Sequence, residues 1–240
     1  DWANISPDIF GSLFQSIMHH EGELEGSRRA RNGPNKRREF GAHYTSEANI
    51  RKVIDALFLD ELKSELRLAK ADPSKLAKLH LRLRGLYCLD PACGCGNFLV
   101  VAYRELRRLE MEVMYALSRV AGGQQVLLPS CNVGQFHGIE VDPTAVQIAT
   151  VALWLADHQM NRNVQTADGT MYCRLPLVQR GNIVCGNALR LDWSGVIPPE
   201  RCSYVMGNPP FLGKKEQSLE QKADMEAVVG SIPGSGILDY

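Results

Sequence analysis

The sequence predicts an α/β fold in which a doubly wound parallel sheet follows an α-helical segment. Apolar residues recur at helical spacing through residues 1–84, and short apolar runs then alternate with long helical patterns in residues 85–240. The apolar runs end in acids or amides, at the strand ends where such sheets bind ligands. We therefore divide the chain into a helical segment, 1–84, and a sheet-bearing core, 85–240.

The helical segment contains three predicted helices and one basic run. Ser6 and Pro7 begin the first helix, a second begins after Ser46, and Asp72 with Pro73 opens the third. The stretch between the first two helices carries six basic side chains: Arg28, Arg29, Arg31, Lys36, Arg37 and Arg38. Such a run is either a solvated loop or an arm that contacts phosphates.

The core alternates predicted strands with two long helices. The strands are "LYCLD" (86–90), "FHGIEVD" (136–142), "NIVCGN" (182–187) and "SYVMGN" (203–208). The helices run from about 97 to about 118 and from 143 to about 158. Strands that alternate with helices in this way favour parallel pairing.

The composition is that of an ordinary globular protein. Hydrophobic residues make up 45% and charged residues 22% of the 240 residues, and the formal net charge is zero, so bulk charge does not indicate nucleic acid. The seven cysteines form no CxxC pair, which argues against zinc, and several lie in apolar runs as reduced thiols of a cytoplasmic protein would. No apolar run reaches membrane-spanning length, so we expect no transmembrane segment and no membrane partner. Because the cysteines lack metal-ligand spacing, we also expect no bound metal. The chain begins at Asp1 and ends without a closing element, so we expect it to be part of a longer protein.

The loop "DPACGCGNF" (90–98) joins the first strand to its helix. Gly94 and Gly96 let the backbone turn tightly and approach a ligand. A dinucleotide fold would have a third glycine where Leu99 stands and an acid about 20 residues further on, whereas Glu140 follows Asp90 by fifty. Because Asp90 would repel a phosphate, the loop favours a cationic or zwitterionic ligand.

Two further strand ends carry polar side chains. Glu140 is placed to accept hydrogen bonds from ribose hydroxyls, or is a surface acid at a strand tip. Asn187 could contact the edge of a purine, or is a turn residue. Taken with the cationic ligand expected at Asp90, a ribose and a purine describe S-adenosylmethionine.

In the stretch "YVMGNPPFLG" (204–213), the last predicted strand ends in an asparagine and is followed by two prolines and a phenylalanine. The simple interpretation is a strand that stops, because proline cannot continue a sheet ladder. The functional interpretation is a rigid shelf in which the Asn208 side chain and the Pro209 carbonyl offer two acceptors beside Phe211. Two converging acceptors beside an aromatic face suit a flat group that carries an NH2.

These motifs, in this order, resemble those of the amino-methyltransferases that modify adenine in DNA. "DPACGCGNF", "GIEVD", "GNAL", "NPPF" and the upstream "FGAHYTS" (40–46) are most similar to the MmeI-like group of type II restriction–modification and phage-defence enzymes. The resemblance covers most of residues 1–213. Cys95 and Asn97 stand where Ser and Thr are frequent, and this departure leaves the glycines intact.

The resemblance implies a Rossmann-like methyltransferase sheet that moves a methyl group from S-adenosylmethionine to the N6 amino group of a flipped adenine in double-stranded DNA. The cofactor residues would be Tyr44, Thr45, Asp90, Pro91, Ala92, Cys93, Gly94, Gly96, Asn97, Phe98, Glu140, Val141, Asn187 and Ala188. Tyr44 and Thr45 would close over the methionine part of the cofactor. The catalytic residues would be Asn208, Pro209, Pro210 and Phe211.

Two alternatives stay open at this point. Asn-Pro-Pro-aromatic also occurs in methyltransferases that act on protein glutamine or on RNA, and a catalytically silent fragment is the third possibility. The resemblance further implies that more strands and a target-recognition domain follow Tyr240. We therefore expect residues 1–240 alone to bind duplex DNA weakly and without sequence preference, because the basic run can make only a handful of phosphate contacts.

Overall fold

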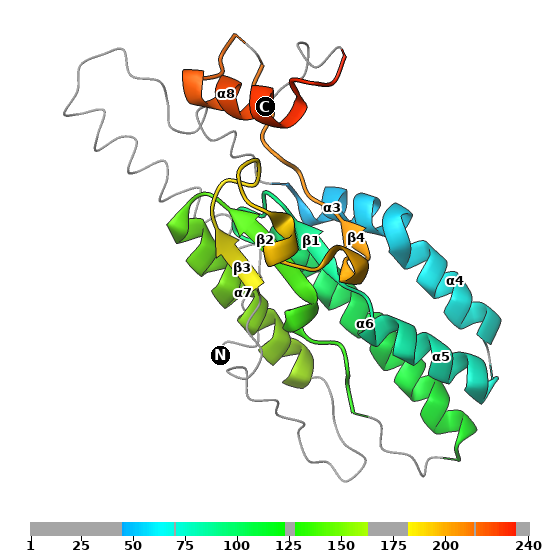
Figure 1. Ribbon diagram of the computed structural model, residues 1–240. Helices are drawn as coiled ribbons and strands as arrows, with labels where there is room; N and C mark the ends of the chain where they lie inside the picture. Colours follow the sequence, from blue (N-terminus) through cyan, green and yellow to red (C-terminus); the bar gives the residue numbers. More distant parts are fainter. Residues whose placement is uncertain (1–44, 70, 123–127, 163–181, 214, 234–240) are drawn as a thin grey trace.

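The computed structural model describes residues 45–69, 71–122, 128–162, 182–213 and 215–233. The predicted first helix, the basic run and Tyr44 lie outside the described residues. Figure 1 shows the described part as a small central sheet with long helices packed along it.

The sheet has four strands in the order β3-β2-β1-β4, and every pairing is parallel. The strands are β1 (Cys88–Asp90), β2 (Phe136–Glu140), β3 (Asn182–Cys185) and β4 (Tyr204–Val205). Each predicted strand is present but shorter than its apolar run. Because β2 and β4 flank β1 on opposite sides, the chain reverses its direction of travel across the sheet at β1, the point where such folds bind ligands. The predicted fold class is confirmed.

The two long core helices form where they are predicted. They are α6 (Asn97–Val120) and α7 (Pro143–Arg162). Phe98, Leu106 and Val113 of α6 belong to the main hydrophobic core, together with Phe136 of β2 and Leu153 of α7. None of the described helices is long and apolar enough to cross a membrane.

In the described part of the helical segment, two helices begin at the caps that the sequence predicts. Ser46 caps α3 by accepting a hydrogen bond from the Asn49 backbone N–H, and Asp72 caps α5 with Pro73 in the first turn. A π-helical turn, η2, divides the predicted second helix into two. The elements are α3 (Glu47–Ile54), η2 (Asp55–Leu59), α4 (Asp60–Ala69) and α5 (Pro73–Arg84).

The helical segment and the sheet share one hydrophobic core. Ile54 and Leu83 belong to the same buried cluster as Leu99, and Phe58 stacks on Tyr204 of β4 with 4.9 Å between the ring centroids. The predicted boundary between residues 84 and 85 falls between α5 and β1. As a division into two domains, it stays a prediction.

The second face of the sheet is covered by the stretch between β3 and β4. This stretch contains the 3-10 turns η4 (Trp193–Gly195) and η5 (Pro199–Arg201). Ile197 packs there against Leu89 and Ile139, which point away from the face that α6 covers. This cover is less complete at β4, where the Val205 side chain is half exposed.

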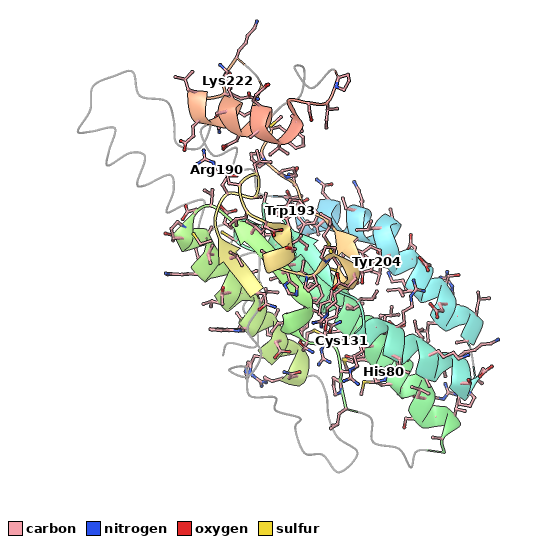
Figure 2. The ribbon with its side chains drawn as sticks, in the orientation of Figure 1. His80, Cys131, Arg190, Trp193, Tyr204 and Lys222 are labelled. Carbon is pink, nitrogen blue, oxygen red and sulfur yellow. The ribbon has the colours of Figure 1, made fainter. Side chains whose placement is uncertain are left out.

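A charged network lies in the interior, against α5 and α6. The side chains of Arg107 and Glu110 are fully buried and form an ion pair at 2.8 Å. Glu110 also accepts hydrogen bonds from the backbone N–H groups of Ser130 and Cys131 and from the Ser130 hydroxyl, and the His80 ring lies 3.2 Å away. His80 and Cys131 are labelled in the same region of the molecule in Figure 2. The cost of burying the Glu110 carboxylate is thus offset by its several hydrogen-bond and ion-pair partners.

One helix was not predicted. Helix α8 (Leu219–Val229) follows the Asn208–Phe211 shelf and stands apart from the helices that flank the sheet (Figure 1). Its start carries a capping box, in which the Ser218 side chain and the Gln221 side chain each bind the other's backbone N–H. The pattern Ser-x-x-Gln in the sequence is the signal that could have predicted it.

Candidate active site

The parallel register brings the ends of β1 and β2 together, so the glycine loop meets Glu140. The Cys93 backbone N–H donates to the Ile139 carbonyl at 3.0 Å, which fixes the loop on the end of β2. The Gly94 N–H then donates to Glu140 Oε2 at 2.8 Å. Two residue groups that the sequence predicts for one ligand are therefore in direct contact.

The glycines of the loop have the conformations that require glycine. Gly94 and Gly96 have φ of +53° and +82°, in the left-handed region. A Cβ on Gly96 would press on Ala149 of α7, so this glycine also allows the loop to pack closely. A Cβ on Gly94 would meet nothing within 4 Å, so open space lies beside the backbone at that point.

Asp90 is a buried carboxylate with little compensation. It is 1% exposed, and its Oδ1 accepts a hydrogen bond from the Ala92 backbone N–H at 3.0 Å. Burial raises the pKa of Asp90 to about 7. The Gly207 backbone lies so close to Asp90 that a Cβ at position 207 would overlap Asp90 Oδ1. An ammonium group beside Asp90 would offset the cost of burying this charge, so the carboxylate fits the amino-acid part of S-adenosylmethionine.

The raised pKa of Asp90 predicts a pH dependence of cofactor binding. A carboxylate that pairs with a cation must first lose its proton, so affinity should rise by about tenfold per pH unit and level off above about pH 7. In the absence of the cofactor, the stability of the folded state should change with pH in the opposite direction to cofactor affinity. The folded state keeps this proton up to about pH 7 while the unfolded chain releases it near pH 3.8, so stability falls as the pH rises through that window.

Calorimetric titrations of S-adenosylmethionine between pH 5.5 and 8 would measure this dependence. The control is Asp90→Asn, which should bind more weakly and with a flatter pH profile because position 90 no longer titrates. An affinity of the wild-type protein that does not change over this range would contradict the role of Asp90.

Glu140 connects the glycine loop to the turn that follows β2. In addition to the bond from Gly94, its Oε1 accepts a hydrogen bond from the Asp142 backbone N–H at 2.9 Å. Burial raises the pKa of Glu140, and the backbone hydrogen bonds act against that rise. A carboxylate has about four acceptor positions, so acceptor capacity remains for a ribose hydroxyl.

Replacing Glu140 with alanine should weaken S-adenosylmethionine binding by about 1–3 kcal/mol, since a charged acceptor and the tie to Gly94 are both lost. Calorimetry of the purified protein measures this. Glu200→Ala removes an exposed acid of η5 and should leave affinity unchanged. Unchanged affinity in Glu140→Ala would refute the ribose assignment.

The shelf lies beside the glycine loop because β4 pairs with β1. The Met206 N–H donates to the Leu89 carbonyl at 2.9 Å, and the chain then leaves the sheet through Gly207. Asn208 is exposed, and its Nδ2 donates to Thr45 Oγ1 at 3.0 Å. The Phe211 ring is 71% exposed, so it is free to contact a substrate.

The Asn187 side chain is engaged in a way that the sequence did not predict. Its Nδ2 donates to Asp224 of α8 at 2.9 Å, and its Oδ1 accepts from the Leu189 N–H at 2.8 Å. Asp224, which is the buried residue of α8, also accepts a hydrogen bond from Arg190 Nε at 2.7 Å. Figure 2 shows Arg190 facing α8. The structure therefore adds Asp224 to the group of residues near the predicted adenine end of the ligand.

The remaining predicted residues lie around the same edge. Cys93 and Phe98 are buried and pack in the core, whereas Val141 is half exposed beyond the end of β2. Partly buried positions are taken by Pro91, Ala92, Asn97, Ala188 and Pro210. Pro209 is exposed, and Tyr44 lies outside the described residues.

Within the described residues, no three side chains of His, Cys, Asp or Glu come together as a metal ion would require. The cysteines there are all free thiols. Burial raises the pKa of Cys95 to about 12, although this residue is part of the glycine loop. A thiol with so high a pKa is almost entirely protonated at neutral pH, so Cys95 is not suited to act as a nucleophile.

Comparison with known proteins supports one family. Residues 66–240 match the family model described as "MmeI, DNA-methyltransferase domain". DNA methyltransferase A of Bacillus subtilis is 40% identical over 243 residues, which cover 100% of this chain and 26% of that protein. A putative type II restriction enzyme and methyltransferase of Methanocaldococcus jannaschii is 24% identical over 78% of this chain and 17% of its own length.

A solved structure is similar over almost the whole chain. It is the type IIL restriction–modification enzyme MmeI in complex with DNA, with a TM-score of 0.84 and 50% identity. The match covers 98% of this chain and 30% of that chain. This chain thus spans less than a third of the relatives that it matches.

Proposed function

Since the chain belongs to the MmeI family of DNA-methyltransferase domains, we propose that it is the catalytic part of an enzyme that methylates the N6 amino group of adenine in double-stranded DNA. S-adenosylmethionine is the methyl donor in this proposal. The full protein would act in the bacterial cytoplasm, as part of a restriction–modification or phage-defence enzyme. Residues of the longer protein would select the DNA sequence.

The observation that carries the proposal is the contact between the two halves of the site. Asp90, the predicted partner of the cofactor's ammonium group, lies against Gly207, and the next residue is Asn208. The place expected for the methyl donor and the acceptors expected for the amine are therefore adjacent, because β1 and β4 are neighbours in the sheet.

The residues present fit the cofactor. Asp90 would hold its amino group, the backbone at Gly94 its methionine part, Glu140 its ribose, and Asn187 with Ala188 its adenine. S-adenosylmethionine supplies a methyl group on a positively charged sulfur, which leaves as a neutral thioether. A buried carboxylate and a glycine loop suit a ligand with this charge better than they suit a nucleotide phosphate.

The protein's own groups would act by positioning the amine. The lone pair of an adenine amino group is delocalised into the ring, so the amine is a poor nucleophile. Asn208 Oδ1 and the Pro209 carbonyl would each accept a hydrogen bond from one N–H of the amine. These two bonds would direct the nitrogen lone pair toward the methyl donor. The two prolines restrict φ in the shelf and keep these acceptors in place. The exposed Phe211 ring would stack on the base after it leaves the duplex.

The family match and the likeness to an MmeI structure in complex with DNA favour DNA over protein glutamine or RNA as the substrate. The full-length protein should be incubated with S-adenosylmethionine labelled in its methyl group and, in parallel, with duplex DNA, RNA and a protein lysate. We expect label in DNA alone. Label in protein or RNA instead would select that alternative, and no label in any substrate would indicate that the protein is catalytically silent.

A further inference from the structure

Thr45 joins the helical segment to the shelf, although 163 residues separate it from Asn208. The Asn208 Nδ2 group donates to Thr45 Oγ1 at 3.0 Å. Thr45 directly precedes Ser46, the N-cap of α3, so its hydroxyl is carried on the end of a helix. The sequence predicts a different role for Thr45, closing over the methionine part of the cofactor.

In this hydrogen bond the Thr45 hydroxyl accepts from the Nδ2 end of the Asn208 amide, which favours the orientation in which the other end faces the substrate. An asparagine side chain has one acceptor, Oδ1, and one donor group, Nδ2. Only Oδ1 can accept a hydrogen bond from the target amine, and rotation of the amide by 180° would oppose two NH2 groups. When Thr45 holds Nδ2, Oδ1 is left for the amine.

The Thr45 hydroxyl is held firmly relative to β4. Ile50 and Ile54 of α3 are buried in the core, and Phe58 in the following turn stacks on Tyr204 of β4. Two ion pairs fix α3 to α6: Arg104 with Glu47 at 3.3 Å and Arg51 with Glu105 at 3.0 Å. Because the same elements support the hydroxyl and the shelf, the bond is preorganised before any ligand binds.

We propose that Thr45 is a positioning residue for methyl transfer, which orients the Asn208 amide so that its oxygen faces the target amine. This inference rests on the proposed function and deepens it. It also separates two roles for Thr45: a residue that orients Asn208 affects the rate of methyl transfer, whereas a residue that binds the cofactor affects cofactor affinity.

The test compares Thr45→Val, which removes the hydroxyl at nearly constant shape, with Thr45→Ser, which keeps it. In the full-length enzyme, on a duplex that the wild type methylates, Thr45→Val should lower the single-turnover rate by about tenfold, the effect of one hydrogen bond. The dissociation constants for S-adenosylmethionine and for DNA should stay within about twofold of wild type, and serine should restore the rate. The matched control is Thr150→Val, because the Thr150 hydroxyl donates to the Val146 carbonyl of its own helix.

A second comparison uses Asn208→Asp, whose carboxylate presents an oxygen on either side and needs no orienting partner. In that background Thr45→Val should cost less than about twofold. If Asn208→Asp is inactive, the contrast between valine and serine at position 45 decides alone.

Three results would overturn the inference: an unchanged rate in Thr45→Val, a loss that serine does not restore, or a rate loss that cofactor saturation repairs. The third would return Thr45 to the cofactor site. A wild-type enzyme that binds S-adenosylmethionine but methylates no DNA would refute the proposed function itself, and this inference with it.

Discussion

Asn208→Ala in the full-length enzyme should lower the rate of methyl transfer by about a hundredfold to a thousandfold. The affinity for S-adenosylmethionine should stay near that of the wild type. The rate falls because a preorganised acceptor for the target amine is lost, and such groups contribute on this scale. Cofactor affinity is kept because Asn208 is exposed at the substrate side and its side chain bonds to Thr45. Single-turnover kinetics with labelled cofactor and calorimetry would measure the two quantities separately.

A suitable control is Asn49→Ala, which removes an exposed asparagine from α3 and should change neither quantity. If the affinity for the cofactor fell in parallel with the rate in Asn208→Ala, the shelf would belong to the cofactor site, and the mechanism proposed for it would be wrong.

Glu110→Ala should lower the free energy of unfolding by about 3–5 kcal/mol, because it leaves the buried Arg107 guanidinium without its ion-pair partner. The N–H groups of Ser130 and Cys131 lose their acceptor at the same time. Urea unfolding followed by circular dichroism would measure the change. Glu112→Ala, an exposed acid on the same helix, should change stability by less than about 0.5 kcal/mol.

The same carboxylate should make stability sensitive to acid. Burial alone would raise the pKa of Glu110, but the hydrogen bond from His80 and the charge of Arg107 outweigh it and lower the pKa to about 2. Its stabilising contribution is therefore complete above the ordinary pKa of 4.5 and is lost as the pH falls toward 2. A loss below about 0.5 kcal/mol in Glu110→Ala would show that the network contributes little.

The sequence predicts the fold, and which candidate site residues lie together, because both depend on local patterns. Short apolar runs that end in Asp90, Glu140, Asn187 and Asn208 predict the strands, and parallel pairing then collects those residues at one edge. The caps at Ser46 and Asp72 correctly predict where α3 and α5 begin.

Contacts between distant parts of the chain could not be predicted in this way. Asn187 meets Asp224 only because α8 folds back over the end of β3, and nothing in either segment specifies that orientation. The charged stretch around Arg107 and Glu110 looks like a solvated helix face, and their burial depends on partners such as His80 that other elements supply. The Thr45–Asn208 bond is of the same kind.

The most direct test of the central claim is to identify the methylated atom. Duplex DNA treated with the full-length enzyme and S-adenosylmethionine would be digested to nucleosides and analysed by mass spectrometry, with Asn208→Ala as the control. We predict N6-methyldeoxyadenosine from the wild-type reaction and, in the same reaction time within the initial linear phase, about a hundredth of that amount or less from the variant. Methylated cytosine, a yield from the variant equal to that of the wild type, or no methylated nucleoside from the wild-type enzyme would contradict the proposal.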